Sequence, residues 1–245
     1  MTIIDGTPQR LFLMQVSSST IPTASGPLEM STACYLIQMS DGKNVLIDSG
    51  LPADYNPPPE APPAEHDKNV IEHLAGLGLR PDDIDLLICT HFDIDHAGHH
   101  DAFTHAELIV QRTHYERARS GEARYAAARA HWDHPALRYR LIDGDSEVLP
   151  GLTVIETSGH APGHQSVLVH LPRTGPVLLA IDAVVMQRLF TSDRRAWPTD
   201  DNEEQLRAST RKLLVLMERE RVALVVFGHD GQQWQTLTKA PMYYE

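Results

Sequence analysis

The chain has 245 residues, of which 42% are hydrophobic, and 33 Asp and Glu against 21 Lys and Arg give a formal net charge of −12. It is long enough to bury a full core, and we expect one domain over residues 1–245. The acidic balance, without a stripe of Lys and Arg to displace phosphate counterions, argues against nucleic acid as a partner.

The first residues, MTIIDGTPQRLFLM, lack the basic and long apolar segments of an export signal, and no apolar run is long enough to cross a membrane. We therefore expect a cytoplasmic protein without a membrane partner. Cys34 and Cys89 each lie inside an apolar segment. They are predicted to be buried thiols, which suits a reducing compartment.

Short apolar segments, many rich in β-branched residues, predict strands along most of the chain. In chain order they are RLFLMQV, CYLIQM, NVLIDSG, DLLICT, ELIVQ, LTVIET, SVLVHL, VLLAID and ALVVFGH. Helical patterns cover residues 67–77, 113–132 and 202–220. Strands grouped towards each end, with helices between and after them, predict sheets that pack on each other and are covered by helices.

A proline-rich stretch, PADYNPPPEAPPAE at residues 52–65, separates the third predicted strand from the first predicted helix. Proline has no amide hydrogen, so this stretch is predicted to be a loop rather than a central strand or a helix interior. Because NVLIDSG leads directly into it, we expect the loop to lie near the functional site.

Histidine and aspartate cluster where the predicted strand DLLICT ends, in the motif HFDIDH. Imidazole and carboxylate together are ligands of divalent transition metals. Side chains of the same two kinds follow later apolar segments, and convergence from distant strand ends is what a preorganised metal site requires. The motif supplies His91, Asp93, Asp95 and His96, and the later segments supply His160, His164, Asp182 and His229.

These motifs resemble the metallo-β-lactamase fold superfamily and, within it, the N-acyl homoserine lactonase family. The resemblance implies an α+β fold, an αββα sandwich of two mixed β-sheets with helices on the outer faces, and a binuclear metal site. It also implies that a homodimer can form. The matching stretches are CYLIQMSDGKNVLIDSGLP, THFDIDHAG, ELIVQRTHYE, LIDGDSEVLPGLTVIETSGHAPGHQSVLV, VLLAIDA and FGHD.

The resemblance implies two divalent metal positions with three ligands each and one bridging ligand. His164 matches a position that supports the ligands. His99 and His100 either orient a ligand or lie at the surface, and we expect the surface. The first metal would be held by His91, Asp93 and His160, the second by Asp95, His96 and His229, and Asp182 would bridge both.

Two positions depart from the family pattern. Asp93 replaces the second histidine of the motif, so three carboxylates and a bridging hydroxide cancel the charge of two divalent ions, where two carboxylates leave one positive charge. The site should be a weaker Lewis acid, with iron or manganese favoured by the harder ligand and zinc by its affinity. The alternative is that Asp93 binds poorly and the first position is partly empty. Val185 replaces a tyrosine that contacts the lactone carbonyl, and loss of such a donor can cost about 2–4 kcal/mol.

The implied reaction is hydrolysis of a small-molecule lactone or ester by a metal-bridging hydroxide, with Asp95 as the catalytic proton donor to the leaving oxygen. Met186, Leu189, Phe190 and Trp197 are candidates for a wall around the acyl tail, or else plain core residues. A second interpretation is a hydrolase of another ester, a thioester, a β-lactam or a phosphoester. A phosphodiester substrate would call for basic residues, and HFDIDHAGHHD has none.

A third interpretation is a binding or redox protein. The di-iron proteins of the superfamily carry a carboxylate at the motif position of Asp93. They work with a flavin-binding domain, whereas only GQQWQTLTKAPMYYE follows FGHD here. We expect a hydrolase.

Overall fold

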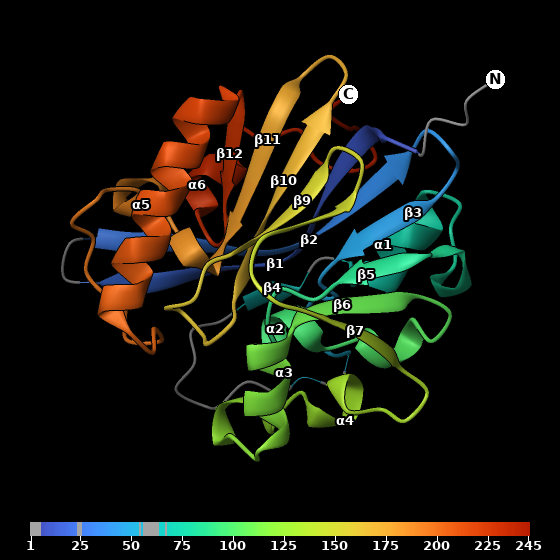
Figure 1. Ribbon diagram of the computed structural model, residues 1–245, viewed down its shortest axis with the longest axis horizontal. Helices are drawn as coiled ribbons and strands as arrows, with labels where there is room; N and C mark the ends of the chain where they lie inside the picture. The colour runs from blue at the N-terminus through green and yellow to red at the C-terminus, as the bar shows by residue number, and fades with distance from the viewer. Residues whose placement is uncertain (1–5, 24–25, 54, 56–63, 67) are drawn as a thin grey trace.

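Two β-sheets pack face to face in the computed structural model, which describes residues 6–23, 26–53, 55, 64–66 and 68–245. The seven-stranded sheet has the order β4-β1-β2-β3-β5-β6-β7, and the five-stranded sheet has the order β12-β11-β10-β9-β8. Both sheets are mixed, because β3, β5, β6 and β7 run parallel while β1–β2 pair antiparallel, and β11–β12 are parallel beside antiparallel β10. Figure 1 shows helices on the outer faces, as the αββα sandwich requires.

Each of the nine predicted apolar segments is confirmed as a strand, and three strands, β4, β7 and β8, were not predicted. The strands are β1 Pro8–Thr23, β2 Gly26–Met39, β3 Asn44–Ile47, β4 Ala64–His66, β5 Leu86–Ile88, β6 Glu107–Gln111, β7 Arg138–Ile142, β8 Ser146–Leu149, β9 Leu152–Glu156, β10 Gln165–Leu171, β11 Gly175–Ile181 and β12 Leu224–Phe227.

The helices are short except for one. They are α1 Val70–Gly76, α2 Ile94–Ala97, α3 Arg112–Arg119, α4 Arg129–Trp132, α5 Glu203–Glu220 and α6 Gly231–Trp234, with 3₁₀ turns η1 Pro81–Asp83, η2 His100–Ala102, η3 Ala123–Tyr125, η4 Asp182–Val184 and η5 Gln187–Leu189. The predicted helix at 202–220 is confirmed as α5, which Asn202 caps by accepting a hydrogen bond from the Gln205 amide. Residue 67, where the first helix was predicted to begin, lies outside the described residues.

Alternation along the strands builds the core. In β11, Val177 and Leu179 face the cluster between the sheets, whereas Leu178 and Ala180 face the cluster under α5. Because β11 is covered on both faces, both of its faces are apolar. The second face of the seven-stranded sheet packs against α1, α3 and α4 in the same way.

The predicted helix over 113–132 is wrong as one element. Helix α3 stops at Arg119, Gly121 takes a φ of +95°, and the chain continues through η3 before α4 begins. A residue with φ in this range cannot continue a right-handed helix, and glycine adopts it at least cost. The break turns the segment towards the strand ends.

The proline-rich loop is confirmed only in part. Gly98 donates a hydrogen bond of 2.7 Å to the Gly50 carbonyl, so the start of the loop lies against the end of α2. Ala64 and Glu65, predicted as loop, belong instead to the short edge strand β4, which pairs with β1. Residues 54 and 56–63 lie outside the described residues.

Candidate metal centre

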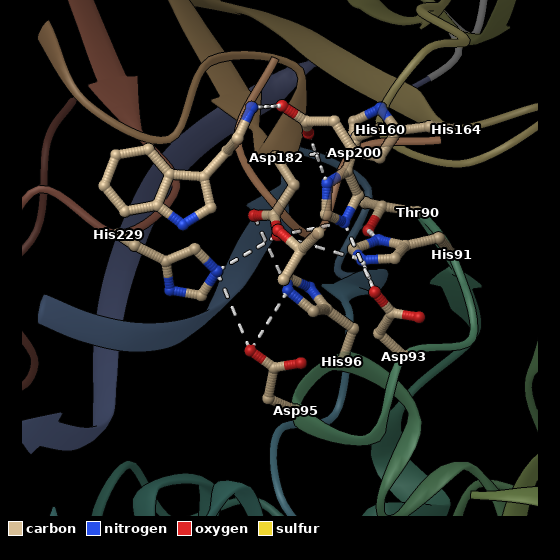
Figure 2. Close-up of polar contacts among 12 residues, drawn as sticks. Thr90, His91, Asp93, Asp95, His96, His160, His164, Asp182, Asp200 and His229 are labelled. Atoms are coloured by element: carbon tan, nitrogen blue, oxygen red, sulfur yellow. Dashed lines mark hydrogen bonds and ion pairs between the residues drawn. The ribbon is translucent and has the colours of Figure 1, made fainter. Parts of the chain in front are cut away.

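The histidines and aspartates singled out in the sequence meet at one edge of the two sheets (Figure 2). The loop after β5, with α2, brings four of them from the seven-stranded sheet, and the segments after β9, β11 and β12 bring three from the five-stranded sheet. Strands end together at the edge of a sheet, so polar groups there need not cross the core. The first four are His91, Asp93, Asp95 and His96, and the other three are His160, Asp182 and His229.

The first group of atoms has the spacing of a tetrahedral metal site. Asp93 Oδ2 lies 3.4 Å from His91 Nε2 and 3.3 Å from His160 Nε2. Asp182 Oδ2 lies 3.4 Å from His160 Nε2 and 3.9 Å from His91 Nε2. Ligands about 2.0–2.1 Å from a tetrahedral ion stand about 3.4 Å apart. These four side chains could hold one ion without moving far.

The second group is built alike and also includes Asp182. Asp95 Oδ2 lies 3.7 Å from both His96 Nε2 and His229 Nε2. Asp182 Oδ1 lies 3.6 Å from His96 Nε2, and its Oδ2 lies 3.1 Å from His229 Nε2. Asp182 therefore stands between the two groups and can bridge them.

Each histidine of the two groups is oriented by a bond at Nδ1. His91 Nδ1 contacts Thr90 Oγ1, His96 Nδ1 contacts Asp48 Oδ2 at 2.8 Å, and His160 Nδ1 contacts Asp200 Oδ1 at 2.9 Å. His229 Nδ1 lies 2.9 Å from the Ser31 carbonyl. Such partners fix a ring so that Nε2 faces the metal.

Some buried polar atoms at the centre have no hydrogen-bond partner. They include His91 Nε2, His96 Nε2 and Asp182 Oδ1. An unsatisfied buried polar atom is costly, and such atoms in a native fold call for an explanation. Since all three face the same space, two bound cations that share Asp182 would satisfy them, and the residues fit a binuclear metal site.

The electrostatics of the centre favour cations. Burial raises the pKa of Asp182, but His229, His96 and His160 outweigh it and hold that pKa well below its ordinary value. Burial lowers the pKa of His160, but Asp182, Asp200 and Asp93 raise it to about 9. The carboxylates thus attract positive charge, and a metal ion would displace protons from the imidazoles.

Local backbone strain marks the same place. Asp48, just after β3, has a φ of +58°, and Ile181, just before the bridging aspartate, has a φ of +50°. Non-glycine residues in this region cost of order 1–3 kcal/mol and cluster at functional sites. At position 228 a Cβ would lie 2.6 Å from Asp182 Oδ1, so only glycine fits before His229.

His164 supports the centre as expected. Its Nδ1 lies 2.9 Å from Thr157 Oγ1, and its Nε2 accepts a bond from the Asp182 amide at 3.3 Å. The expectation that His99 and His100 lie at the surface is wrong: they are 8% and 0% exposed. His100 Nδ1 lies 2.7 Å from Ser49 Oγ.

Three charged residues at the centre were missed in the sequence: Asp48, Asp200 and Arg124. Asp48 could have been found, because it ends the apolar run NVLI just as the ligands end theirs. Asp200 lies in a loop without periodicity. Arg124 donates to both oxygens of Asp93, from Nε at 2.7 Å and from Nη2 at 2.6 Å. The extra carboxylate at 93 was the signal for a nearby cation.

The candidates for an acyl-tail wall lie in different surroundings. Leu189 and Phe190 pack against the core cluster under α5, so for them the plain packing alternative holds. Met186 lines a groove of about 620 Å³ with Pro27, Leu28 and Arg188. Trp197 lies 5.9 Å from the Arg188 guanidinium.

Both cysteines are free and buried, as predicted. Burial raises the pKa of each thiol well above its ordinary value, so neither is a ready nucleophile.

Among the described residues, no helix has the length and apolar character needed to span a bilayer.

A family profile and similar characterised proteins point to the same family. The sequence profile of the metallo-beta-lactamase superfamily matches residues 28–229. The chain is 31% identical to N-acyl homoserine lactonase AiiA of Bacillus thuringiensis subsp. kurstaki over 96% of this chain and 95% of that protein. It is 33% identical to N-acyl homoserine lactonase AttM of Rhizobium johnstonii over 88% of each.

Solved structures agree. A quorum-quenching N-acyl homoserine lactone hydrolase superposes with a TM-score of 0.87 at 29% identity, over 98% of this chain and all of that one. An N-acyl homoserine lactone hydrolase with N-hexanoyl-L-homoserine bound at its catalytic metal center superposes with a TM-score of 0.84 at 28% identity, over 97% of this chain and all of that one.

Proposed function

The chain belongs to the metallo-β-lactamase superfamily and, within it, to the N-acyl homoserine lactonase family, and we propose that it is a metal-dependent hydrolase that opens the ring of N-acyl homoserine lactones. The relative with N-hexanoyl-L-homoserine at its metal center supports this substrate class. Ring opening destroys a signal of this class, so the proposed activity is quorum quenching.

One observation carries the proposal. Four imidazoles anchored at Nδ1 and the shared carboxylate of Asp182 turn their Nε2 and Oδ atoms towards one space at the sheet edge, and three of these atoms have no hydrogen-bond partner. We assign the first metal position to His91, Asp93 and His160, the second to Asp95, His96 and His229, and the bridge to Asp182. When bound, two divalent ions would supply Lewis-acid chemistry to polarise an ester carbonyl and to make water acidic near neutral pH.

Asp95 is the proposed proton carrier to the leaving oxygen. Its side chain is 27% exposed, against 17% for Asp93 and 5% for Asp182, so it is the carboxyl of the centre that substrate and solvent can reach most easily. Asp182 is enclosed by three imidazoles and serves to position them. Asp48 and Asp200 keep His96 and His160 turned towards the centre.

We propose zinc as the metal because nitrogen ligands and affinity order favour it, with iron or manganese as the alternatives that Asp93 introduces. We further propose that the chain is one domain, that it acts in the cytoplasm and that it can form a homodimer. These finer points rest on the family and on the composition.

The test is proton release during ring opening of short- and long-chain N-acyl homoserine lactones. Metal-stripped protein is compared with protein reloaded with zinc, manganese, iron or cobalt. Asp182→Asn should abolish the activity, whereas Asp143→Asn, which changes a carboxylate that is 67% exposed and paired with Arg112, should keep it. Ring opening by metal-stripped protein, or by the Asp182 variant, would sink the proposal.

A second candidate is hydrolysis of another carboxylic ester or of a thioester. Val185, where the family pattern has a tyrosine, is 4% exposed and offers no donor to a substrate carbonyl. Adding simple lactones, aryl esters and thioesters to the same panel separates the two candidates, since the second requires turnover of these substrates without turnover of homoserine lactones.

A further inference from the structure

Arg124 lies next to the first metal position, although it belongs to no ligand motif. The break after α3 brings it there on turn η3. Its side chain is only 19% exposed, and the Asp93 side chain that it meets is 17% exposed. A long cationic side chain buried to this degree beside a proposed metal ligand calls for a reason.

The guanidinium is fixed on several sides. Nε and Nη2 grip the two oxygens of Asp93, a fork geometry that arginine alone among side chains provides. Nη1 donates to the carbonyls of His160 at 2.8 Å and Thr199 at 2.9 Å, and to Asp201 Oδ1 at 2.8 Å. These bonds hold Arg124 in one pose rather than leaving it as a surface ion pair.

Nη2 also reaches a ligand atom, because it lies 2.8 Å from His160 Nε2. A neutral imidazole has one nitrogen lone pair, and this is the form that binds a metal ion. Neutral His160 therefore cannot serve Arg124 and a metal ion at once. A carboxylate oxygen has more lone pairs, so Asp93 can keep Arg124 on one side and face an ion on the other. Loading of the first position therefore requires Arg124 to release His160 but not Asp93.

Charge points the same way. Asp93 adds a third carboxylate to a centre that has two in the family pattern, and the guanidinium cancels the charge that this substitution adds. We propose that Arg124 competes with the metal ion at the first position: it holds Asp93 in the ligand pose while Nη2 takes the lone pair of His160. The first position then binds its ion more weakly than the second. This inference rests on the proposed metal centre.

The test is metal affinity rather than turnover. Metal-stripped wild-type protein and variants are titrated with Zn²⁺ against a chromophoric chelator, and ions per chain are counted by elemental analysis. Wild type should show one tight and one weaker ion. Arg124→Gln should tighten the weaker ion by about 10- to 100-fold, the range seen when groups outside the ligand set are changed.

Two further variants guard the interpretation. Arg124→Lys keeps a cation beside Asp93 but cannot span Asp93 and His160 together, so it should tighten the weaker ion by less than Arg124→Gln does. It also decides the matter if Arg124→Gln does not fold. Arg117→Gln removes the same charge from a side chain that is 56% exposed and paired with Glu122, and it should change neither affinity.

The contrary outcomes are distinct. Unchanged affinities in both Arg124 variants, or loss of an ion from them, would overturn the competition and leave the metal centre standing. Failure of every form, wild type included, to bind Zn²⁺ would overturn the centre and this inference together.

Discussion

The two proposed metal positions share Asp182 but balance their charge differently. At the first, Asp93 is clamped by Arg124 and its pKa lies well below the ordinary value because burial, which raises it, is outweighed by the hydrogen bond from Arg124 and by His91. At the second, burial lowers the pKa of His96, but Asp95, Asp182 and Asp48 raise it well above its ordinary value. The difference teaches that the cation affinity of a ligand set depends on neighbours that are not ligands.

The largest expected effect comes from removing one nitrogen ligand at each position. His160→Ala and His229→Ala should each lower lactone hydrolysis by more than about 100-fold, because even partners outside the ligand set are worth up to that factor. Each variant should also lose about one ion per chain. Turnover rates and elemental analysis check this, and full activity with two retained ions in either variant would contradict the ligand assignment.

An intermediate effect is expected from the carboxylates that orient the rings. Asp200→Asn should weaken the first ion and Asp48→Asn the second, each by about 10- to 100-fold, because the asparagine amide holds the imidazole less firmly. Chelator competition measures both affinities. Loss of the same ion in both variants would show that the positions are not independent in the way that the structure indicates.

The smallest effect concerns the break after α3 at Gly121, which lets the chain place Arg124 beside the first metal position. Gly121 has a φ of +95° with nothing within 4 Å of an added Cβ, so Gly121→Ala should cost about 1 kcal/mol in free energy of unfolding through backbone strain alone. Gly42, with a φ of +91° and equally open space, is the matched control. Urea unfolding of both variants should give similar losses, and an unchanged Gly121 variant would mean that the break relaxes freely.

Much of the fold could be read from the sequence because burial leaves a pattern. All nine apolar segments became strands, and the helical pattern over residues 202–220 became α5. The strands that were missed, β4, β7 and β8, are short or polar. Strand β7 lies at a sheet edge and alternates the exposed Arg138 and Arg140 with the half-buried Tyr139 and Leu141. Edge strands need little apolar character, so periodicity could not reveal them.

The residues of the site likewise divide into those that the sequence pattern revealed and one that it did not. Its seven proposed ligands follow strand ends, and spacing together with family likeness was enough to gather them, though their roles stay a prediction. Arg124 could not be found this way, because the Ala- and Arg-rich segment around it has a helical pattern. Only tertiary contacts with Asp93, Thr199 and Asp201 decide where it points. A non-local contact of this kind leaves no period in the sequence.

The origin of the ligands has one more consequence. Each proposed position takes two side chains from the segment after β5 and one from the five-stranded sheet, and Asp182 adds a further carboxylate from that sheet to both. A bound ion would thus link the two sheets of the sandwich through its ligands. At a free concentration 100 times its Kd, an ion that binds only the folded chain adds about 2.7 kcal/mol to folding stability. Chelation would then lower the melting temperature as well as the activity, and metal supply would govern how much folded protein a cell keeps.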